Sequence, residues 1–256
     1  MSVVRVGVAG ASGRMGQALL EAAATTEGVA VGSAVDLAAG AWGSVAIGTD
    51  VSAAIAQCDV LVDFTRPAGT LEHVRACTSA RRAIVIGTTG FAPAQADEIR
   101  RAAASIAIVM APNMSVGVNV MLKLVELGSR ALGPDYDVEV FEMHHRKKVD
   151  APSGTALKLG EVAAAARGAR LDQAGVFARH GNTGERRAGS LGFSVARGGD
   201  VVGDHTVFFA GTGERIEITH RSNSRATYAQ GAMRAARFLA GKSPGLYDMQ
   251  DVLGLR

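Results

Sequence analysis

The sequence predicts an α/β protein in which an N-terminal Rossmann-type doubly wound parallel sheet is followed by a second α+β domain built on a mixed or antiparallel sheet. Two observations predict this fold. Up to Ser115, short β-branched runs alternate with helical patterns, as in βαβ units. After Ser115, apolar runs follow one another across connections too short for a parallel crossover. The closing helix should return to the first half, so we expect domains of 1–115 plus 224–256, and 116–223.

The composition is that of an ordinary globular protein. Of 256 residues, 48% are hydrophobic and 20% are charged. A net charge of +3 and 5% aromatic residues give little support to a nucleic-acid partner. The longest apolar runs fall far short of the roughly 18 residues that span a bilayer, and the start lacks a signal-peptide pattern. We therefore expect a cytoplasmic protein with no membrane partner, in which Cys58 and Cys77 are buried, reduced thiols.

A glycine loop opens the first half. Residues 3–9 predict a buried strand, the turn GASGRMG follows, then a helical pattern, and then a strand over 29–35 that ends at Asp36. Strand, glycine turn, helix, strand and acid are the ordered parts of a mononucleotide-binding unit. The glycines let backbone N–H groups approach a pyrophosphate, and the acid can accept ribose hydroxyls. The spacing G-x-x-G-x-x-G departs from the standard motif, and a tight turn without a ligand is the alternative.

The alternation continues to the end of the first half. Strands are predicted over 60–64, 83–86 and 106–110, and helices over 68–81 and 93–104. The strands end in the turns DFTRP, GTTG and APNMS. Because ligands bind beyond the carboxyl ends of parallel strands, these turns suit a nicotinamide ring and its ribose. Each turn taken alone is also ordinary turn chemistry.

The second half combines helices with longer strands. The pattern predicts helices over 116–132 and 154–166, a strand over 136–144, a Gly- and Arg-rich loop over 167–189, three antiparallel strands within 191–199, 201–211 and 214–222, and a closing helix over 228–240. The closing helix should pack on the first half, because a Rossmann sheet needs cover on both faces. An exposed face of the second sheet would suit an oligomer interface.

The strongest concentration of charge is the stretch EMHHRKKVDAPSGT. Five consecutive residues, His144–Lys148, are basic, and strand alternation puts Glu142 and His144 on one face. The segment then enters D-A-P-S-G-T, which is typical of a helix N-terminus and forms a second anion site. Such a site suits a small molecule with two carboxylates, beside a histidine that can exchange a proton. Carboxylate or thiolate ligands at workable spacing are missing, so no metal is expected.

The whole chain resembles the dihydrodipicolinate reductase family. The resemblance rests on VAGASGRMG, VDFTRP, VIGTTGF, APNMSVGVNV, EMHHRKKVDAPSGTA, HGNTGERRAGSLGF and GDHTVFFAGTGERIEITHRSNSR. It implies reduction of the cyclic product of dihydrodipicolinate synthase to tetrahydrodipicolinate with NADH or NADPH, in diaminopimelate and lysine biosynthesis. A homotetramer joined through the second sheet is also implied.

The resemblance also implies roles for individual residues. His144 and Lys148 match the catalytic proton donors, and His145 with Ser153, Gly154 and Thr155 forms the substrate-carboxylate site. The residues that match dinucleotide contacts are Gly10, Ala11, Ser12, Gly13, Arg14, Met15, Asp36, Gly87, Thr88, Thr89, Ala111, Pro112, Asn113 and Met114.

Some positions depart from the family pattern. Lys147 stands where a third histidine is common, Pro112 and Met114 replace other residues, and Leu37 follows Asp36 where dual-cofactor members carry a basic residue. An acid without an adjacent cation disfavours a 2′-phosphate, so we expect a modest NADH preference with NADPH also used. Two alternatives remain open: another NAD(P)-dependent reductase acting on an amino or sugar acid, and a non-catalytic nucleotide-sensing or nucleic-acid-binding module.

Overall fold

The computed structural model describes residues 3–224 and 226–256. The chain separates into two compact units, Met1–Val116 with Arg225–Arg256, and Gly117–Ser224. Each unit has its own sheet and its own hydrophobic core. No helix within the described residues is long and apolar enough to cross a membrane.

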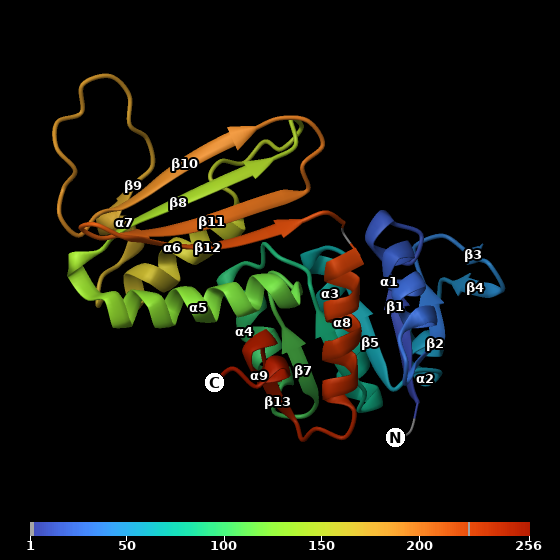
Figure 1. The fold of residues 1–256 in the computed structure, drawn as a ribbon. Helices are drawn as coiled ribbons and strands as arrows, with labels where there is room; N and C mark the ends of the chain where they lie inside the picture. Colours follow the sequence, from blue (N-terminus) through green and yellow to red (C-terminus); the bar gives the residue numbers. More distant parts are fainter. Residues whose placement is uncertain (1–2, 225) are drawn as a thin grey trace. The chain divides into compact units, whose positions relative to one another are not determined.

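The first unit is built on an eight-stranded sheet of order β13-β7-β6-β5-β1-β2-β4-β3 (Figure 1). All its pairings are parallel except that of β3 with β4. The predicted Rossmann-type parallel sheet is therefore confirmed. Its strands are β1 (Val4–Ala9), β2 (Val29–Val35), β3 (Gly40–Trp42), β4 (Val45–Gly48), β5 (Val60–Asp63), β6 (Ala83–Ile86), β7 (Ala107–Met110) and β13 (Gly245–Tyr247).

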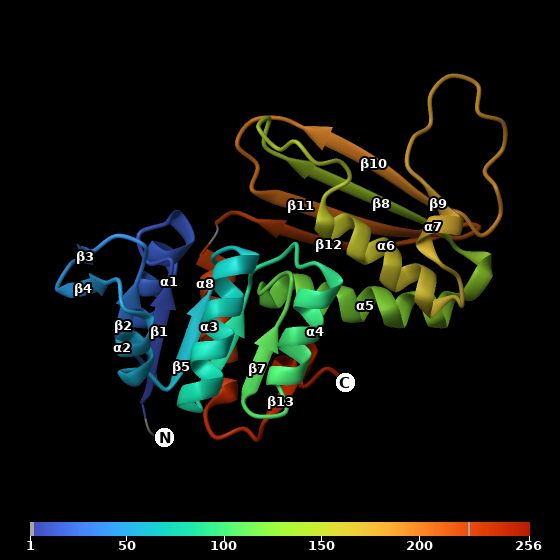
Figure 2. The same ribbon diagram turned by 180° about the vertical axis from the view of Figure 1, so that it is seen from behind.

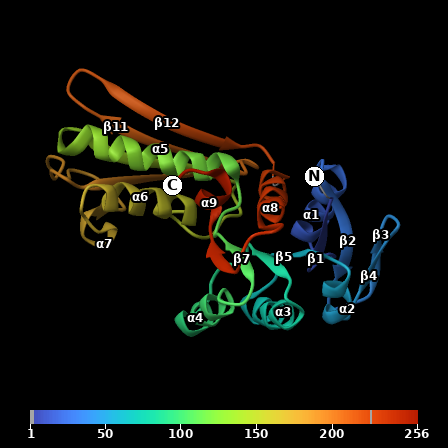
Figure 3. The same cartoon turned by 90° about the horizontal axis from the view of Figure 1, so that it is seen from below.

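Helices cover both faces of this sheet, as Figures 2 and 3 show. Strand alternation supplies two cores: Val60 and Val62 join one, while Leu61 joins the other. The first core holds α1 (Arg14–Thr25), α8 (Ala226–Leu239) and α9 (Met249–Leu253), and the second holds α2 (Val51–Ala56), α3 (Pro67–Ala80) and α4 (Pro93–Ala102). The prediction that the closing helix packs on the first half is confirmed.

Several short elements were not predicted. They are β3, β4 and α2, between Asp36 and Val60, α7 (Leu171–Ala174) and β9 (Gly175–Val176), inside the segment predicted as a loop, and β13 with α9 in the C-terminal tail. Helices α2 and α9 begin at side-chain caps: Asp50 accepts from the N–H groups of α2, and Asp248 from those of α9. These helices have six and five residues, which is too short for a 3.6-residue period to emerge from the sequence.

The second unit is a five-stranded sheet with helices on one face (Figures 1 and 2). The strand order is β12-β11-β8-β10-β9. The core contains apolar residues from β8, β10 and β11 together with α5 and α6. The elements are α5 (Val116–Leu132), a 3-10 turn (Gly133–Asp135), β8 (Asp137–His144), α6 (Gly154–Ala166), α7 (Leu171–Ala174), β9 (Gly175–Val176), β10 (Leu191–Arg197), β11 (Gly203–Ala210) and β12 (Arg215–Ser222).

The expectation of three consecutive antiparallel neighbours was wrong for β10. Strand β8 lies between β10 and β11, parallel to the first and antiparallel to the second. The connecting loop passes over the carboxyl end of β8, where Gly198 N–H donates to His144 O over 2.9 Å and His145 N–H donates to Val201 O over 2.7 Å. A loop of this length requires β10 and β11 to run in opposite directions. It does not require them to be neighbours, because one strand fits between them. The hairpin of β11 with β12 is confirmed, and the sheet is mixed.

Candidate active site

The glycine loop lies between β1 and α1 and is shaped by close backbone approach. Gly10 has φ +70°, and a Cβ at Gly16 would lie 2.1 Å from Gly10 O. Gly13 is the N-cap of α1, so no side chain covers this helix N-terminus. An N-terminus formed in this way offers backbone N–H groups to an anion. Residues Gly10 to Met15, which are predicted to contact a dinucleotide, thus form a tight turn at the start of α1.

Asp36 follows β2 and is joined to the glycine loop. Its Oδ2 accepts the Ser12 N–H over 2.8 Å, and its Oδ1 accepts the Leu37 N–H over 2.7 Å. Burial alone would raise the pKa of Asp36, but these backbone hydrogen bonds hold the pKa below its usual value. A carboxylate accepts about four hydrogen bonds, so the ionised group retains capacity for ribose hydroxyls. Leu37 is almost fully exposed and adds no cation.

The two remaining predicted cofactor turns also lie at the carboxyl edge of the first sheet. Thr88, between Gly87 and Thr89 after β6, is buried and accepts a hydrogen bond from Thr70 over 2.9 Å. After β7, Asn113 Oδ1 accepts the Ser115 N–H over 2.9 Å. The turn Ala111–Met114 packs under the closing helix, because a Cβ at Gly231 would lie 1.8 Å from Met114 O. The predicted cofactor residues thus lie in four segments of one unit, after the carboxyl ends of β1, β2, β6 and β7.

In the second unit, His144 is the last residue of β8 and is held by a buried carboxylate. Its Nδ1 lies 2.5 Å from Glu142 Oε2. Arg197 donates to both oxygens of the same carboxylate over 2.8 and 2.9 Å. The predicted alternation is confirmed, since both His144 and Glu142 are buried on one face of the strand.

Glu142 is ionised in this arrangement. With 1% of its surface exposed, burial alone would raise its pKa, but hydrogen bonds from Arg197, His144 and the Ser153 N–H lower the pKa below its usual value. The bond to Nδ1 fixes how the His144 ring is oriented. An imidazole held in a fixed orientation can exchange a proton with a bound molecule.

The same carboxylate reaches the start of α6. Glu142 Oε1 accepts the Ser153 N–H over 3.0 Å. Ser153 is the N-cap of α6, its Oγ accepts the Ala156 N–H over 3.2 Å, and it lies 3.0 Å from His205 Nε2. The helix start that contains Gly154 and Thr155 is thus tied to the strand end that contains His144. The structure brings together the predicted proton site and the predicted carboxylate site.

His205 is a buried neutral imidazole beside this helix start. Burial and the neighbouring His144 lower its pKa to about 4. The two imidazole rings meet edge to face, with centroids 5.1 Å apart. A neutral His205 can share a hydrogen with Ser153 Oγ without adding charge to the site.

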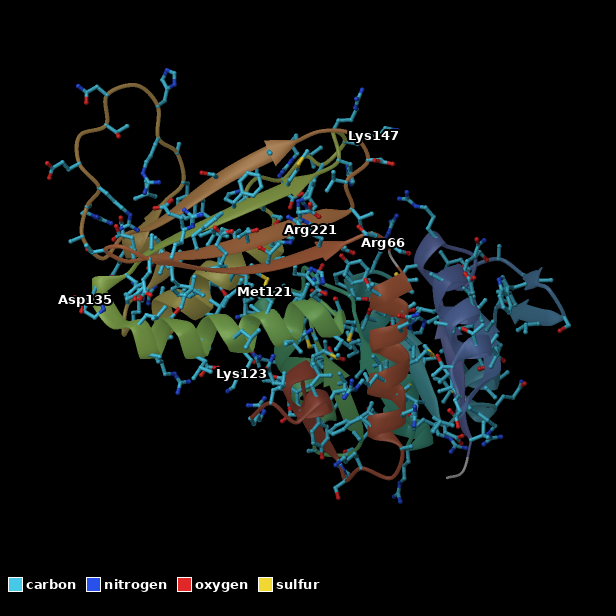
Figure 4. All side chains as sticks on the ribbon, in the orientation of Figure 1. Arg66, Met121, Lys123, Asp135, Lys147 and Arg221 are labelled. Carbon is cyan, nitrogen blue, oxygen red and sulfur yellow. The ribbon has the colours of Figure 1, made fainter. Side chains whose placement is uncertain are left out.

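Lys148 lies in the turn that follows β8. Its backbone N–H donates to His145 O, and its Nζ lies 2.8 Å from both Asp150 oxygens. The hydrogen bond from Lys148 holds the pKa of Asp150 below its usual value. Lys147 is exposed and projects away from the sheet (Figure 4), whereas the Nδ1 of His145 is buried without a partner among the described residues.

Sequence reasoning missed the residues that connect these groups. Arg197 and Asp150 link His144 to Lys148, because Arg197 also donates to Asp150 O over 2.7 Å. His205 and the buried pair of Asp63 with His73 were also missed. The one sequence signal for this network was Glu142, a carboxylate two residues before His144 on the same strand face. Arg197 could not be assigned to it, because it lies 55 residues after Glu142 on another strand.

Metal chemistry receives no support from this geometry. Within 3–224 and 226–256, no three His, Cys, Asp or Glu side chains are grouped so as to hold a metal ion. The arrangement contains proton donors, an anion-binding helix start and, in the other unit, a dinucleotide-type loop. Each unit thus contains one part of the chemistry that the sequence predicts.

Comparisons with known proteins agree on one family. Residues 4–114 match the family described as dihydrodipicolinate reductase, N-terminus, and residues 117–253 match dihydrodipicolinate reductase, C-terminus. The chain is 58% identical to the 4-hydroxy-tetrahydrodipicolinate reductase of Bordetella pertussis, over 98% of this chain and 97% of that protein. It is 55% identical to the enzyme of the same name from Nitrosospira multiformis, over the full length of both.

Solved structures share the fold. Dipicolinate-bound dihydrodipicolinate reductase from Paenisporosarcina sp. TG-14 has a TM-score of 0.78 at 24% identity, with 98% of this chain and 99% of that chain covered. A probable dehydrogenase from Thermotoga maritima has a TM-score of 0.63 at 12% identity, with 97% and 92% covered. With both halves matched and full-length relatives well above 50% identity, the chain belongs to the dihydrodipicolinate reductase family.

Proposed function

We propose that this protein is an NAD(P)H-dependent oxidoreductase that reduces (2S,4S)-4-hydroxy-2,3,4,5-tetrahydrodipicolinate, after loss of water, to tetrahydrodipicolinate in diaminopimelate and lysine biosynthesis. The observation that carries the proposal is the carboxylate of Glu142, which joins His144 to the N-terminus of α6. A proton donor beside an anion site is what reduction of a cyclic dicarboxylate requires. Full-length relatives with this named activity support the choice of substrate.

The cofactor would be held by the first unit. The positive φ of Gly10 and the tight contact at Gly16 leave a cradle for a pyrophosphate, and Asp36 offers a carboxylate to a ribose. The turns after β6 and β7 supply the further contacts, through Gly87, Thr88 and Thr89 and through Ala111, Pro112, Asn113 and Met114. When bound, the dinucleotide supplies the hydride of the reaction.

The second unit would bind the substrate and supply the proton. Ser153, Gly154 and Thr155 stand at the start of α6, where backbone N–H groups favour a carboxylate. His145 and the cations beside it would hold the second carboxylate. Reduction adds a hydride and a proton, so negative charge develops on the ring and a nearby cation stabilises it.

His144 and Lys148 are the two candidate proton donors. We assign proton transfer to both, with Glu142 orienting the His144 ring and Asp150 holding the Lys148 side chain. Charged donors placed where negative charge develops stabilise the transition state more than the ground state.

We further propose a modest preference for NADH, with NADPH also used. The Asp36 carboxylate is ionised and adjoins the exposed, uncharged Leu37. An uncompensated negative charge there opposes a 2′-phosphate, although Arg14 in the glycine loop is a possible partner for one. Equal kcat/KM for the two cofactors, or a clear advantage for NADPH, would contradict this assignment.

A homotetramer in the cytoplasm is the proposed working form. Helices cover one face of the second sheet, whereas Phe141, Met143 and Phe208, which alternate with the core residues of β8 and β11, lie on the other face and are half-buried. An apolar face left open on a sheet is suited to pairing with another copy. The cytoplasm is proposed because reduced nicotinamide cofactors are kept there for biosynthesis. Sedimentation of the purified protein tests the assembly.

The activity is tested by following oxidation of NADH with freshly made synthase product. The wild type should turn over, Lys148→Ala should lose about a hundredfold in kcat, and His144→Ala should lose mainly kcat. Lys158→Ala is the matched control, because Lys158 lies on α6 and forms an exposed ion pair with Glu161. No oxidation by the wild type would reject the enzyme assignment, and near-normal kcat in Lys148→Ala would reject that role.

The same assay separates the two alternatives. Turnover of an amino or sugar acid, with none of the synthase product, would favour a different reductase. Salt-sensitive binding of DNA or RNA without turnover would favour a non-catalytic binding module.

A further inference from the structure

A buried carboxylate–imidazole pair lies at the carboxyl edge of the first sheet. Asp63 is the last residue of β5 and is fully buried, and His73 on α3 places its Nδ1 2.7 Å from Asp63 Oδ2. The other oxygen, Oδ1, accepts the N–H and the hydroxyl of Thr65, each over 2.7 Å. A carboxylate out of contact with water is costly unless such bonds satisfy it.

The pair is extended by two more hydroxyl groups. Thr88 Oγ1 donates to Asp63 Oδ1 over 3.4 Å, and Thr70 Oγ1 donates to Thr88 Oγ1 over 2.9 Å. Thr65 and Thr70 place their hydroxyl oxygens 3.4 Å apart. The Asp63 cluster, defined as Asp63, His73 and these three threonines, therefore joins the β5–α3 turn, α3 and the β6–α4 turn.

The same cluster touches the glycine loop. A Cβ at Gly10 would lie 2.9 Å from Thr65 Cγ2, so the loop packs directly on this threonine. A Cβ at Gly87 would lie 2.2 Å from the ring of Phe64, which brings the β5–α3 and β6–α4 turns into contact a second time. Arg66, labelled in Figure 4, follows Thr65 and is exposed. The glycine loop, the β5–α3 turn and the β6–α4 turn therefore meet around the Asp63 cluster, and the first and third of them carry predicted cofactor residues.

We propose that Asp63 and His73 are positioning residues for the nicotinamide dinucleotide, which set cofactor affinity by fixing three loops in the geometry that binds it. The inference rests on the proposed function. Within the described residues, the hydrogen-bond partners of the Asp63 carboxylate belong to α3, to the β5–α3 turn or to the β6–α4 turn. Apolar residues of similar volume would commonly stabilise a core as well as a buried ionic pair does. Loops fixed before binding lose less entropy when the ligand arrives.

His73→Ala removes the imidazole and tests the proposal through two separate measurements. Titration of intrinsic fluorescence with NADH gives Kd, and steady-state kinetics give kcat and both KM values. We expect Kd and KM for NADH to rise about tenfold, which corresponds to about 1.4 kcal/mol. We expect kcat and the KM of the dicarboxylate to change by less than about threefold, because His73 lies outside the proton-transfer site.

Rescue and control variants separate positioning from general stability. His73→Asn places an amide N–H near the position of Nδ1 and should restore Kd to within about threefold of the wild type. Thr65→Val keeps side-chain shape and removes one hydroxyl donor, so a smaller rise in Kd is expected. Ser33→Ala is the control: Ser33 is also buried in this unit and donates to Ala54 O over 2.7 Å. It should lower the melting temperature and leave NADH binding unchanged.

The outcomes distinguish this inference from the function on which it rests. A wild type that neither binds NADH nor turns over would reject the proposed function. A wild type that does both, with His73→Ala and Thr65→Val binding NADH normally, would overturn the positioning role alone. Equal loss of NADH affinity in Ser33→Ala, or no rescue by asparagine, would also overturn it.

Discussion

Replacing Glu142 by glutamine should separate the proton-donating role of His144 from its place in the fold. The wild-type carboxylate accepts four hydrogen bonds, one from His144, two from Arg197 and one from the Ser153 N–H. An amide keeps one acceptor oxygen and turns an N–H₂ group toward donors. At least one donor is left unpaired, and the positive charge of Arg197 loses its counter-ion.

The magnitude follows from burial. Breaking a buried ion pair costs about 3–5 kcal/mol, and the lower end applies because the Arg197 side chain is 21% exposed and can reach water. We therefore expect Glu142→Gln to lose about 3 kcal/mol of unfolding free energy. His144 also loses the carboxylate that orients its ring, so kcat should fall about a hundredfold.

The difference in stability between wild type and Glu142→Gln should depend on pH. The folded pKa of Glu142 is lowered, so its stabilising effect is fully present above the unfolded pKa of about 4.3. It is lost as pH falls through the lower, folded pKa. Urea unfolding at neutral pH and below pH 4 measures this, and NADH oxidation at neutral pH measures kcat.

Glu139→Gln is the matched control. Glu139 lies on the same strand and pairs with two arginines, Arg179 and Arg186, and has no histidine partner in these contacts. It should lose stability and keep normal kcat. If Glu142→Gln retained kcat within about threefold, or if both variants lost kcat equally, the argument for Glu142 would be refuted.

Three further predictions concern single contacts. Gly16→Ala should raise Kd for NADH more than about tenfold, because its Cβ would lie 2.1 Å from Gly10 O; titration with NADH measures this, and unchanged affinity contradicts it. His205→Gln should flatten the fall in stability from pH 7 to pH 5. The folded pKa of about 4 lies below the unfolded value, so the unfolded state takes up the proton first as pH falls. The wild type should therefore lose about 2 kcal/mol of unfolding free energy by pH 5; urea unfolding at both pH values tests it. Gly231→Ala should cost about 2 kcal/mol or more, because its Cβ would lie 1.8 Å from Met114 O; an unchanged melting temperature would refute this.

The first unit was largely predictable from the sequence because its signals are local. The β-branched run from Val4 to Ala9, the glycine turn and the helix after it follow directly along the chain. Fully buried parallel strands give continuous apolar runs that are easily recognised. The short strands β3, β4 and β13, at the two ends of the sheet, have three or four residues each. Pairing with the neighbouring strands decides their structure.

The second sheet shows where local signals stop. The loop after Arg197 predicted that β10 and β11 run in opposite directions, and they do. Which strand lies between them depends on contacts distant in sequence, since β8 precedes β10 by about fifty residues. The sequence contains no local mark of that insertion.

The candidate site shows the same division. The proposed residues from His144 to Thr155 lie within one short stretch of sequence, so a sequence motif can identify them. Arg197 and His205 come from β10 and β11 and meet Glu142 or Ser153 only because β8 lies beside both strands. The strand insertion that sequence analysis missed is therefore what brings Arg197 and His205 to the site.

Each unit contains a buried carboxylate–imidazole pair, and we assign the two pairs different roles. In each, a buried carboxylate near a strand end accepts a turn N–H and binds the Nδ1 of a histidine: Asp63 with His73, and Glu142 with His144. The difference lies in the third partner. Glu142 also binds the guanidinium of Arg197, and its histidine ends the strand beside a helix start suited to carboxylates. Asp63 binds hydroxyl groups, and its histidine belongs to α3, beside the proposed cofactor loops. Loss of the Glu142–His144 pair should therefore lower kcat with little change in NADH affinity. Loss of the Asp63–His73 pair should lower NADH affinity with little change in kcat. If both variants changed the same parameter, the two pairs would belong to one coupled network.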